Sequence, residues 1–186
     1  RRAEDAINEK NPDLVGEERK QVARKVGIGA VKYADLSTER TKDYVFDWER
    51  MLSFEGNTAP YLQYAHARIC SIFRKWGGER DSLRADLDSI LEDGQSSLSN
   101  EELTLARRLV EFPSILDDSI STFSPHKICK QLHSVASSFA SFYENCSILN
   151  EENPKLSRRR LALCDLTARE LQLGLGILGI DVPERM

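Results

Sequence analysis

Apolar and polar residues are spaced along most of the chain with the period of an amphipathic helix. Apolar side chains recur at every third or fourth position, and several stretches begin after Ser, Thr or Asn and end before Gly or Pro. Pro113 interrupts one stretch, and we expect it to break the helix there because proline cannot donate an intrahelical hydrogen bond. The pattern predicts helices over residues 1–9, 17–31, 58–76, 100–112, 114–120, 124–146 and 157–179.

Two segments lack this period. Residues 36–57 mix charged and aromatic residues, and the run from Tyr44 to Trp48 suits a short strand or an extended connector. Residues 77–98 are polar and rich in serine, so we expect a variable linker. With one weak strand candidate among many helices, the predicted fold class is all-α, a helical bundle preceded by further helices.

Composition narrows the class of protein. The 186 residues are 40% hydrophobic and 30% charged, which is typical of a globular protein. No apolar run approaches the roughly 20 residues that a membrane-spanning helix needs, so we expect no membrane role. The four cysteines are scattered through apolar helical stretches, which predicts free, buried thiols in a reducing compartment. The net charge of −4 means that any polyanion must be held by a local basic patch.

The predicted helix over residues 58–76 has two neighbouring faces. One is apolar and suits a bundle core, whereas the other, roughly 110° away, carries Tyr64 and Arg68 one turn apart. A ring beside a planar cation is a common way to bind single-stranded RNA, because a base stacks on the ring and the cation meets a phosphate. The alternative is that Tyr64 covers the edge of the core and Arg68 pairs with a carboxylate, and spacing alone favours this alternative.

Three other groups of residues have some features of a binding site. Gly27 and Gly29 lack the Gly-Lys-Ser/Thr sequence of a phosphate loop, so we expect them to allow close helix packing. A metal could be bound by three side chains on one predicted helix, those of His126, Cys129 and His133, but a fourth ligand is not evident and packing is favoured.

The basic cluster 158–160 either pairs with acids such as Glu151 and Glu152 or faces an anion.

Two long stretches carry a resemblance to a known family. The segments "VGIGAVKYADLSTERTKDYVFDWERMLSFEGNTAPYLQYAHARICSIFRK" and "RRRLALCDLTARELQLGLGILGIDVPERM" closely resemble the C-terminal third of arginyl-tRNA synthetases, class I enzymes that attach arginine to its tRNA. The unusual run "MLSFEGNTAPYLQY" and the last four residues "PERM" are the most specific parts. The resemblance implies that residues 1–56 are the end of the catalytic half, with stem-contact helices and a junction. It also implies that residues 57–186 form the all-α, DALR-type anticodon-binding domain, with 77–98 as its variable linker.

The resemblance also implies where the chemistry lies. The family's His-Ile-Gly-His and Lys-Met-Ser-Lys-Ser type signatures, which build the ATP and arginine site, do not occur in this chain. We therefore expect no catalytic residue, cofactor or metal site in this portion, which would be inactive alone, with ATP and magnesium bound in the catalytic half. The implied partner is the anticodon loop of tRNA(Arg), bound by a monomer in the cytoplasm or an organellar matrix. No DNA or membrane partner is expected.

In the family, the positions of Tyr64, Arg68 and Met186 face the anticodon loop, and all three residue types are present here. The aromatic helix containing Phe139 and Tyr143 is a further candidate for this surface. Two rival functions remain: a detached helical module that binds a protein partner, and a small helical metalloprotein.

Overall fold

The computed structural model describes residues 1–43, 45–85 and 98–186, and this part of the chain contains helices and no strand. The predicted all-α class is therefore confirmed. None of the described helices is both long and apolar enough to cross a membrane. The helices are α1 (Arg2–Lys10), α2 (Gly16–Leu36), α3 (Trp48–Met51), α4 (Ala59–Trp76), α5 (Arg80–Ala85), α7 (Asn100–Thr122), α8 (Pro125–Asn145) and α9 (Pro154–Ile177).

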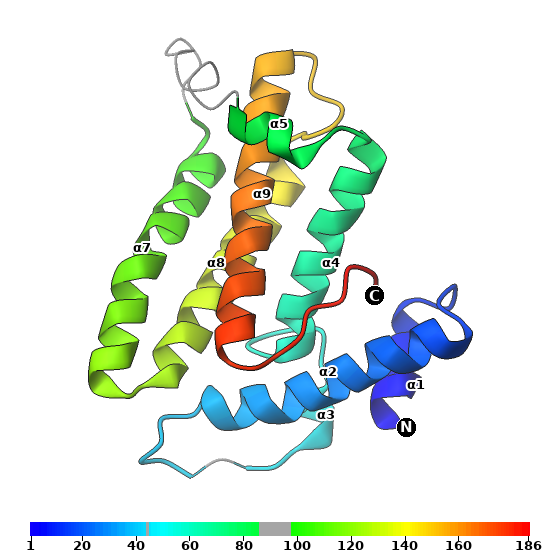
Figure 1. Ribbon diagram of the computed structural model, residues 1–186, viewed down its shortest axis with the longest axis vertical. Helices are drawn as coiled ribbons and strands as arrows, with labels where there is room; N and C mark the ends of the chain where they lie inside the picture. Colours follow the sequence, from blue (N-terminus) through cyan, green and yellow to red (C-terminus); the bar gives the residue numbers. More distant parts are fainter. Residues whose placement is uncertain (44, 86–97) are drawn as a thin grey trace.

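Four long helices, α4, α7, α8 and α9, stand side by side as a bundle, and α2 crosses beneath them with α1 packed against it (Figure 1). The apolar stripes of the four helices meet in one core, as amphipathic helices require. A second, smaller core lies where α1 and α2 meet α4 and the C-terminal tail. The second core contains Ile7, Leu14, Val22, Ala23, Val26, Ala67 and Met186.

Local sequence signals explain the ends of α4. The Thr58 side chain accepts a hydrogen bond of 3.2 Å from the Tyr61 backbone N–H, and Pro60 lies in the first turn, where its missing N–H is not needed. At the other end Gly77 adopts a φ of 71°, the left-handed conformation that commonly closes a helix. The helix that carries Tyr64 and Arg68 is thus fixed at both ends.

The predicted break at Pro113 is wrong, because α7 runs through this residue from Asn100 to Thr122. Pro113 is exposed, and the apolar residues on either side of it, Leu109, Phe112 and Leu116, pack on the bundle core. Tertiary packing of this face offsets the hydrogen bond that proline removes.

The segment predicted as a strand or extended connector is not a strand in its described part. Asp47 caps the short helix α3 by accepting from the backbone N–H groups of Glu49 and Arg50 at 2.9 and 3.3 Å. Tyr44 and residues 86–97 of the predicted linker lie outside the described residues.

Close helix packing at the glycines of α2 is confirmed. A Cβ atom on Gly29 would lie 3.0 Å from both Gln63 Nε2 and Ile180 Cγ2. The absence of a side chain therefore lets α2 approach α4 and the tail closely. All four cysteines are free and buried, as predicted.

Candidate nucleic-acid interface

The two predicted faces of α4 are present. Leu62 and Ile69 are fully buried in the bundle core, whereas Tyr64, Arg68 and Ser71 are half-buried at its surface. The helical period thus separates the core-forming residues from a row of side chains that a ligand can reach.

Tyr64 and Arg68 contact each other directly. Arg68 Nη2 donates to the Tyr64 hydroxyl at 3.3 Å, and the guanidinium carbon lies 5.0 Å from the ring centroid. This hydrogen bond is the main reason why the pKa of the Tyr64 phenol is lowered, since the nearby cation favours the phenolate, although burial opposes the shift. The alternative from the sequence holds for the ring but not for the guanidinium. Tyr64 packs against the edge of the second core, whereas within the described residues no carboxylate forms an ion pair with Arg68.

A second ring lies against the same guanidinium. Arg68 is 5.1 Å from the centroid of Tyr143 on α8, whose side chain is 40% exposed. Phe139, the other candidate on that helix, is 1% exposed and belongs to the core. Residues four apart on a helix share a face, but α8 turns enough to bury one ring and leave the other at the surface. Of these two candidates, Tyr143 alone has a ring that a ligand can reach.

The C-terminal tail, residues 178–186, leaves α9 and runs back across α4 toward α1 (Figure 1). Side chains of the folded helices hold the tail by its backbone carbonyls. Gln63 Nε2 donates to Asp181 O at 2.7 Å, and Arg74 Nη1 donates to Glu184 O at 3.1 Å. His66 Nδ1 lies 3.2 Å from Pro183 O.

The end of the tail contacts α1 and α2. Asn11 Nδ2 donates to Met186 O at 2.9 Å, and the Met186 side chain is 8% exposed in the second core, against Leu14 and Ala67. Burial of this apolar side chain fixes the tail beside Tyr64. The structure thus places Met186 next to the two residues of α4 that the resemblance singled out.

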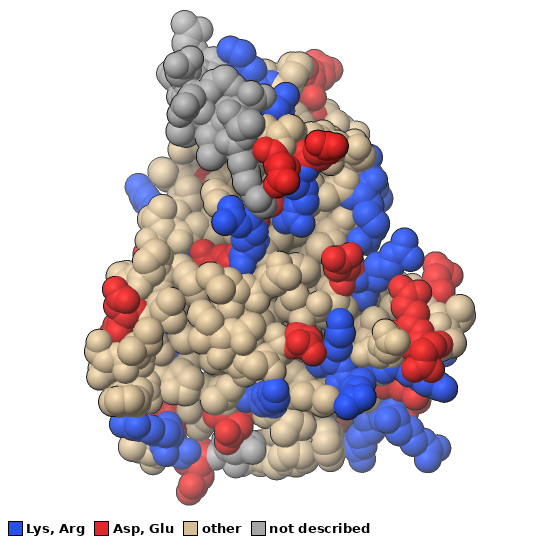
Figure 2. Space-filling view, in the orientation of Figure 1, with Lys and Arg blue, Asp and Glu red and all other residues tan. Residues whose placement is uncertain are grey.

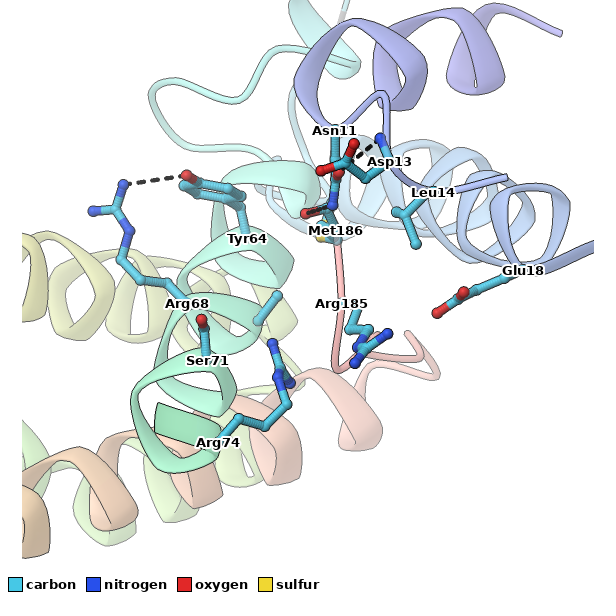
Figure 3. A pocket seen from close by; sticks show the side chains of 11 residues that line it. Asn11, Asp13, Leu14, Glu18, Tyr64, Arg68, Ser71, Arg74, Arg185 and Met186 are labelled. Atoms are coloured by element: carbon cyan, nitrogen blue, oxygen red, sulfur yellow. Dashed lines mark hydrogen bonds between the residues drawn. The ribbon is translucent and has the colours of Figure 1, made fainter. Parts of the chain in front are cut away.

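Together these elements enclose a pocket of about 400 Å³ (Figure 3). Tyr64 and Arg68 come from α4, Arg185 and Met186 from the tail, and Asn11 from the end of α1. A neighbouring pocket of about 360 Å³ shares Arg68 and Ser71 with the first and is otherwise lined by Ile72, Lys75, Tyr143 and residues 146–150. Arg68 therefore lies between two hollows, each with a tyrosine.

Positive charge gathers near this region although the chain is acidic overall. Figure 2 shows Lys and Arg side chains concentrated on the side of the molecule that carries α4, the tail and the start of α2, with acidic side chains between them. The cations that line the two pockets are Arg68, Arg74, Lys75 and Arg185, and Asp13 and Glu18 are the acidic residues of the first. This is the kind of local basic patch that the negative net charge requires of a polyanion-binding protein.

The basic cluster 158–160 has mainly structural partners. Arg159 and Arg160 form ion pairs with buried Glu102 at 3.2 and 3.3 Å, and Arg160 also pairs with Glu151 at 2.7 Å. Pairing with acids, one of the two alternatives from the sequence, is therefore what the structure has for these two arginines. Glu102, on α7, could not be identified as a partner because it lies far away in the sequence.

The possible metal ligands do not come together. Cys129 is fully buried in the bundle core, and His133 is half-buried with its ring 5.7 Å from that of Tyr61. In the parts of the chain that the structure describes, no three His, Cys, Asp or Glu side chains are grouped so that they could hold a metal ion.

Several residues of the pocket could not be predicted from the sequence. Asn11 directly follows the first helix, and Arg74 and Arg185 carried no motif, so only the fold brings them to Tyr64. No local signal in the sequence predicts that the tail returns to α1, because the contacts join residues up to 175 positions apart.

Comparison with known proteins shows which protein family the chain belongs to. Residues 62–186 match the DALR anticodon binding domain, and residues 1–48 match the class I (R) tRNA synthetase catalytic domain. The chain therefore belongs to the DALR anticodon-binding domain family. Along its whole length it is 50% identical to the arginine–tRNA ligase of Cellvibrio japonicus and 49% identical to that of Yersinia pestis.

The chain also resembles solved structures of arginyl-tRNA synthetases. The chain superimposes along its whole length on arginyl-tRNA synthetase from Thermus thermophilus, with a TM-score of 0.85 and 31% identity. The arginyl-tRNA synthetase of Plasmodium falciparum gives a TM-score of 0.80 and 28% identity over 99% of the chain. The chain spans only 31% of the length of the Cellvibrio relative and 30% of the Thermus chain.

Proposed function

We propose that the chain is the tRNA-binding C-terminal part of an arginine–tRNA ligase and that it binds the anticodon loop of tRNA(Arg). The observation that carries this proposal is the meeting of Tyr64, Arg68 and Met186 at one pocket, although Met186 is more than a hundred residues away in sequence. The family match and the sequence identity to arginine–tRNA ligases support it.

In this proposal an unstacked base of the loop lies against the Tyr64 ring, and Arg68 meets a phosphate or a base edge. Arg68 already donates to the Tyr64 hydroxyl, so its guanidinium is oriented before the RNA arrives. Met186 supplies an apolar wall that limits the depth of the pocket. These side chains bind and orient RNA and do not act on a covalent bond.

We also propose the division of the chain that the family resemblance implies. Residues 1–56 form the end of the catalytic half with its stem-contact helices, and residues 57–186 form the anticodon-binding bundle. The whole enzyme would attach arginine to tRNA(Arg), with ATP and magnesium bound in the preceding catalytic half. We propose a monomer that acts in the cytoplasm, with tRNA(Arg) as its partner.

The test is binding of tRNA transcripts to Tyr64→Ala, Tyr64→Phe and the unchanged chain. Base stacking on an aromatic ring contributes about 1–3 kcal/mol, so Tyr64→Ala should weaken the affinity for tRNA(Arg) roughly tenfold or more. Tyr64→Phe keeps the ring and should retain most of the affinity. Filter binding at several salt concentrations measures both, and affinity should fall steeply with salt because phosphates are neutralised.

Two controls make the result specific. A tRNA(Arg) transcript with a changed anticodon should bind more weakly to the unchanged chain, and thermal unfolding of Tyr64→Ala should show that its helices remain intact. Equal affinity of Tyr64→Ala and the unchanged chain would contradict the proposal. A large loss of thermal stability in Tyr64→Ala would instead assign the ring to the core.

A further inference from the structure

Lys10, the last residue of α1, lies over the ring of Tyr64. Its Nζ is 4.5 Å from the Tyr64 centroid and 5.5 Å from that of Phe54. The two rings are 6.1 Å apart with an interplanar angle of 77°, so the ammonium group sits in the notch between them. No motif in the sequence marks this lysine.

The ammonium of Lys10 is available to a ligand. The residue is exposed, and the described part of the chain offers it no carboxylate partner within ion-pair distance. Its contacts are the faces of two aromatic rings, which hold a cation less strongly at an exposed site than a phosphate in direct contact does. A phosphate near Tyr64 can therefore take the ammonium without breaking an ion pair.

Lys10 also comes from a different part of the chain than Tyr64. Residues 1–48 match the catalytic domain of class I (R) synthetases, whereas Tyr64 lies within the DALR match. The end of α1 supplies the next residue, Asn11, to the pocket as well. The surface around Tyr64 is thus built jointly by both regions.

We propose that Lys10 is a third RNA-binding residue of this surface and contacts a backbone phosphate next to the base that stacks on Tyr64. This inference rests on the proposed function. Arg68 and Lys10 both approach the Tyr64 ring, at 5.0 and 4.5 Å from its centroid. A nucleotide stacked on Tyr64 contacts one cation from each region, Lys10 from α1 and Arg68 from α4. Binding of the RNA therefore links α1 to the bundle.

The experiment measures the affinity of the full 186-residue chain for a tRNA(Arg) transcript as a function of salt, with Lys10→Ala and Lys10→Arg. Loss of one exposed charge contact should weaken binding about fivefold. The slope of log affinity against log salt concentration should become shallower by roughly one, which is the contribution of a single phosphate contact. Lys10→Arg retains the charge and should restore both quantities.

The matched control is Lys130→Ala, which removes an exposed lysine of α8 at the opposite end of that helix from Tyr143. The proposal is overturned if Lys10→Ala behaves as Lys130→Ala does. It is also overturned if affinity falls while the salt dependence stays unchanged, since Lys10 would then only orient the ring. Weaker binding by Tyr64→Ala with no effect of Lys10→Ala refutes Lys10 alone, whereas no effect of either refutes the proposed function too.

Discussion

Arg68 is the residue on which the candidate surface depends most. Its guanidinium lies about equally far from two rings, Tyr64 at 5.0 Å and Tyr143 at 5.1 Å, and donates to the hydroxyl of the first. A single side chain therefore orders aromatic groups from α4 and α8. Because guanidinium is planar and keeps its charge, lysine could not replace it in this position.

The titration of Tyr64 reports this contact. Arg68 stabilises the phenolate and lowers the pKa of Tyr64 below the ordinary value, so Arg68→Met should raise the pH at which this phenol ionises. Ultraviolet absorbance during an alkaline titration measures tyrosinate, and subtraction of the Tyr64→Phe curve isolates this residue from the other tyrosines. An unchanged midpoint in Arg68→Met would show that the hydrogen bond does not persist in solution.

Among the elements, α9 shows how one helix can contain both a required glycine and a dispensable one. Gly174 is buried, and a Cβ there would lie 2.5 Å from Leu132 Cδ2 on α8. Gly176 is exposed, and a Cβ there would meet no atom within 4 Å. The first glycine lets two helices approach each other, and the second only weakens the helix.

Alanine substitutions should separate these two roles. Gly174→Ala forces the fully buried Leu132 to move and should destabilise the protein by about 1–3 kcal/mol. Gly176→Ala should stabilise it by about 0.5–1 kcal/mol, because alanine is the better helix former. Urea unfolding followed by circular dichroism gives both values, and a shift of both variants in the same direction would contradict the assigned roles.

Most of the helices could be predicted from the sequence, because helix caps and the spacing of apolar residues act locally. Thr58, Gly77 and the Ser99 capping box lie where the helix boundaries were expected. Pro113 misled the prediction because a local rule about hydrogen bonds competed with tertiary packing, which the sequence does not display. Which of Phe139 and Tyr143 is exposed likewise depends on tertiary packing, since helical spacing gives a shared face but not where the core ends.

Across the whole molecule, one buried carboxylate joins the start of α7 to the start of α9. Glu102 is 1% exposed, accepts from the Ser99 backbone N–H at 2.8 Å and pairs with Arg159 and Arg160. One side chain therefore caps α7 and ties it to the start of α9. The sequence indicated that the arginines needed an acidic partner or an anion, but only the fold identifies Glu102.

Removal of this carboxylate should be much more costly than removal of its neighbour. Glu102→Ala leaves two partly buried guanidinium groups without their shared partner and should destabilise the protein by about 3 kcal/mol. Glu151→Ala, whose side chain is 20% exposed, should cost no more than about 1 kcal/mol. Equilibrium unfolding in urea distinguishes them, and equal losses would show that Glu102 is not the centre of the network.

The residues of the candidate site, too, could be predicted from the sequence only in part. Tyr64 and Arg68 could be paired from helical spacing, and Met186 came only from the family resemblance. Lys10 and Asn11 carried no signal at all. Their approach depends on how α1 packs against α2 and on where the tail ends, and such long-range contacts are a property of the folded chain.

The way in which the tail is held has a consequence for evolution. Gln63 and Arg74 bind its carbonyl groups, and every residue type has a carbonyl, so these bonds place no demand on the tail's own side chains. Ile180, Pro183 and Met186 are buried and constrained by packing, whereas Asp181 and Glu184 are exposed. Related chains should therefore accept substitutions at 181 and 184 while the path of the tail stays the same, and Gln63 and Arg74 should change more slowly than the residues that they hold.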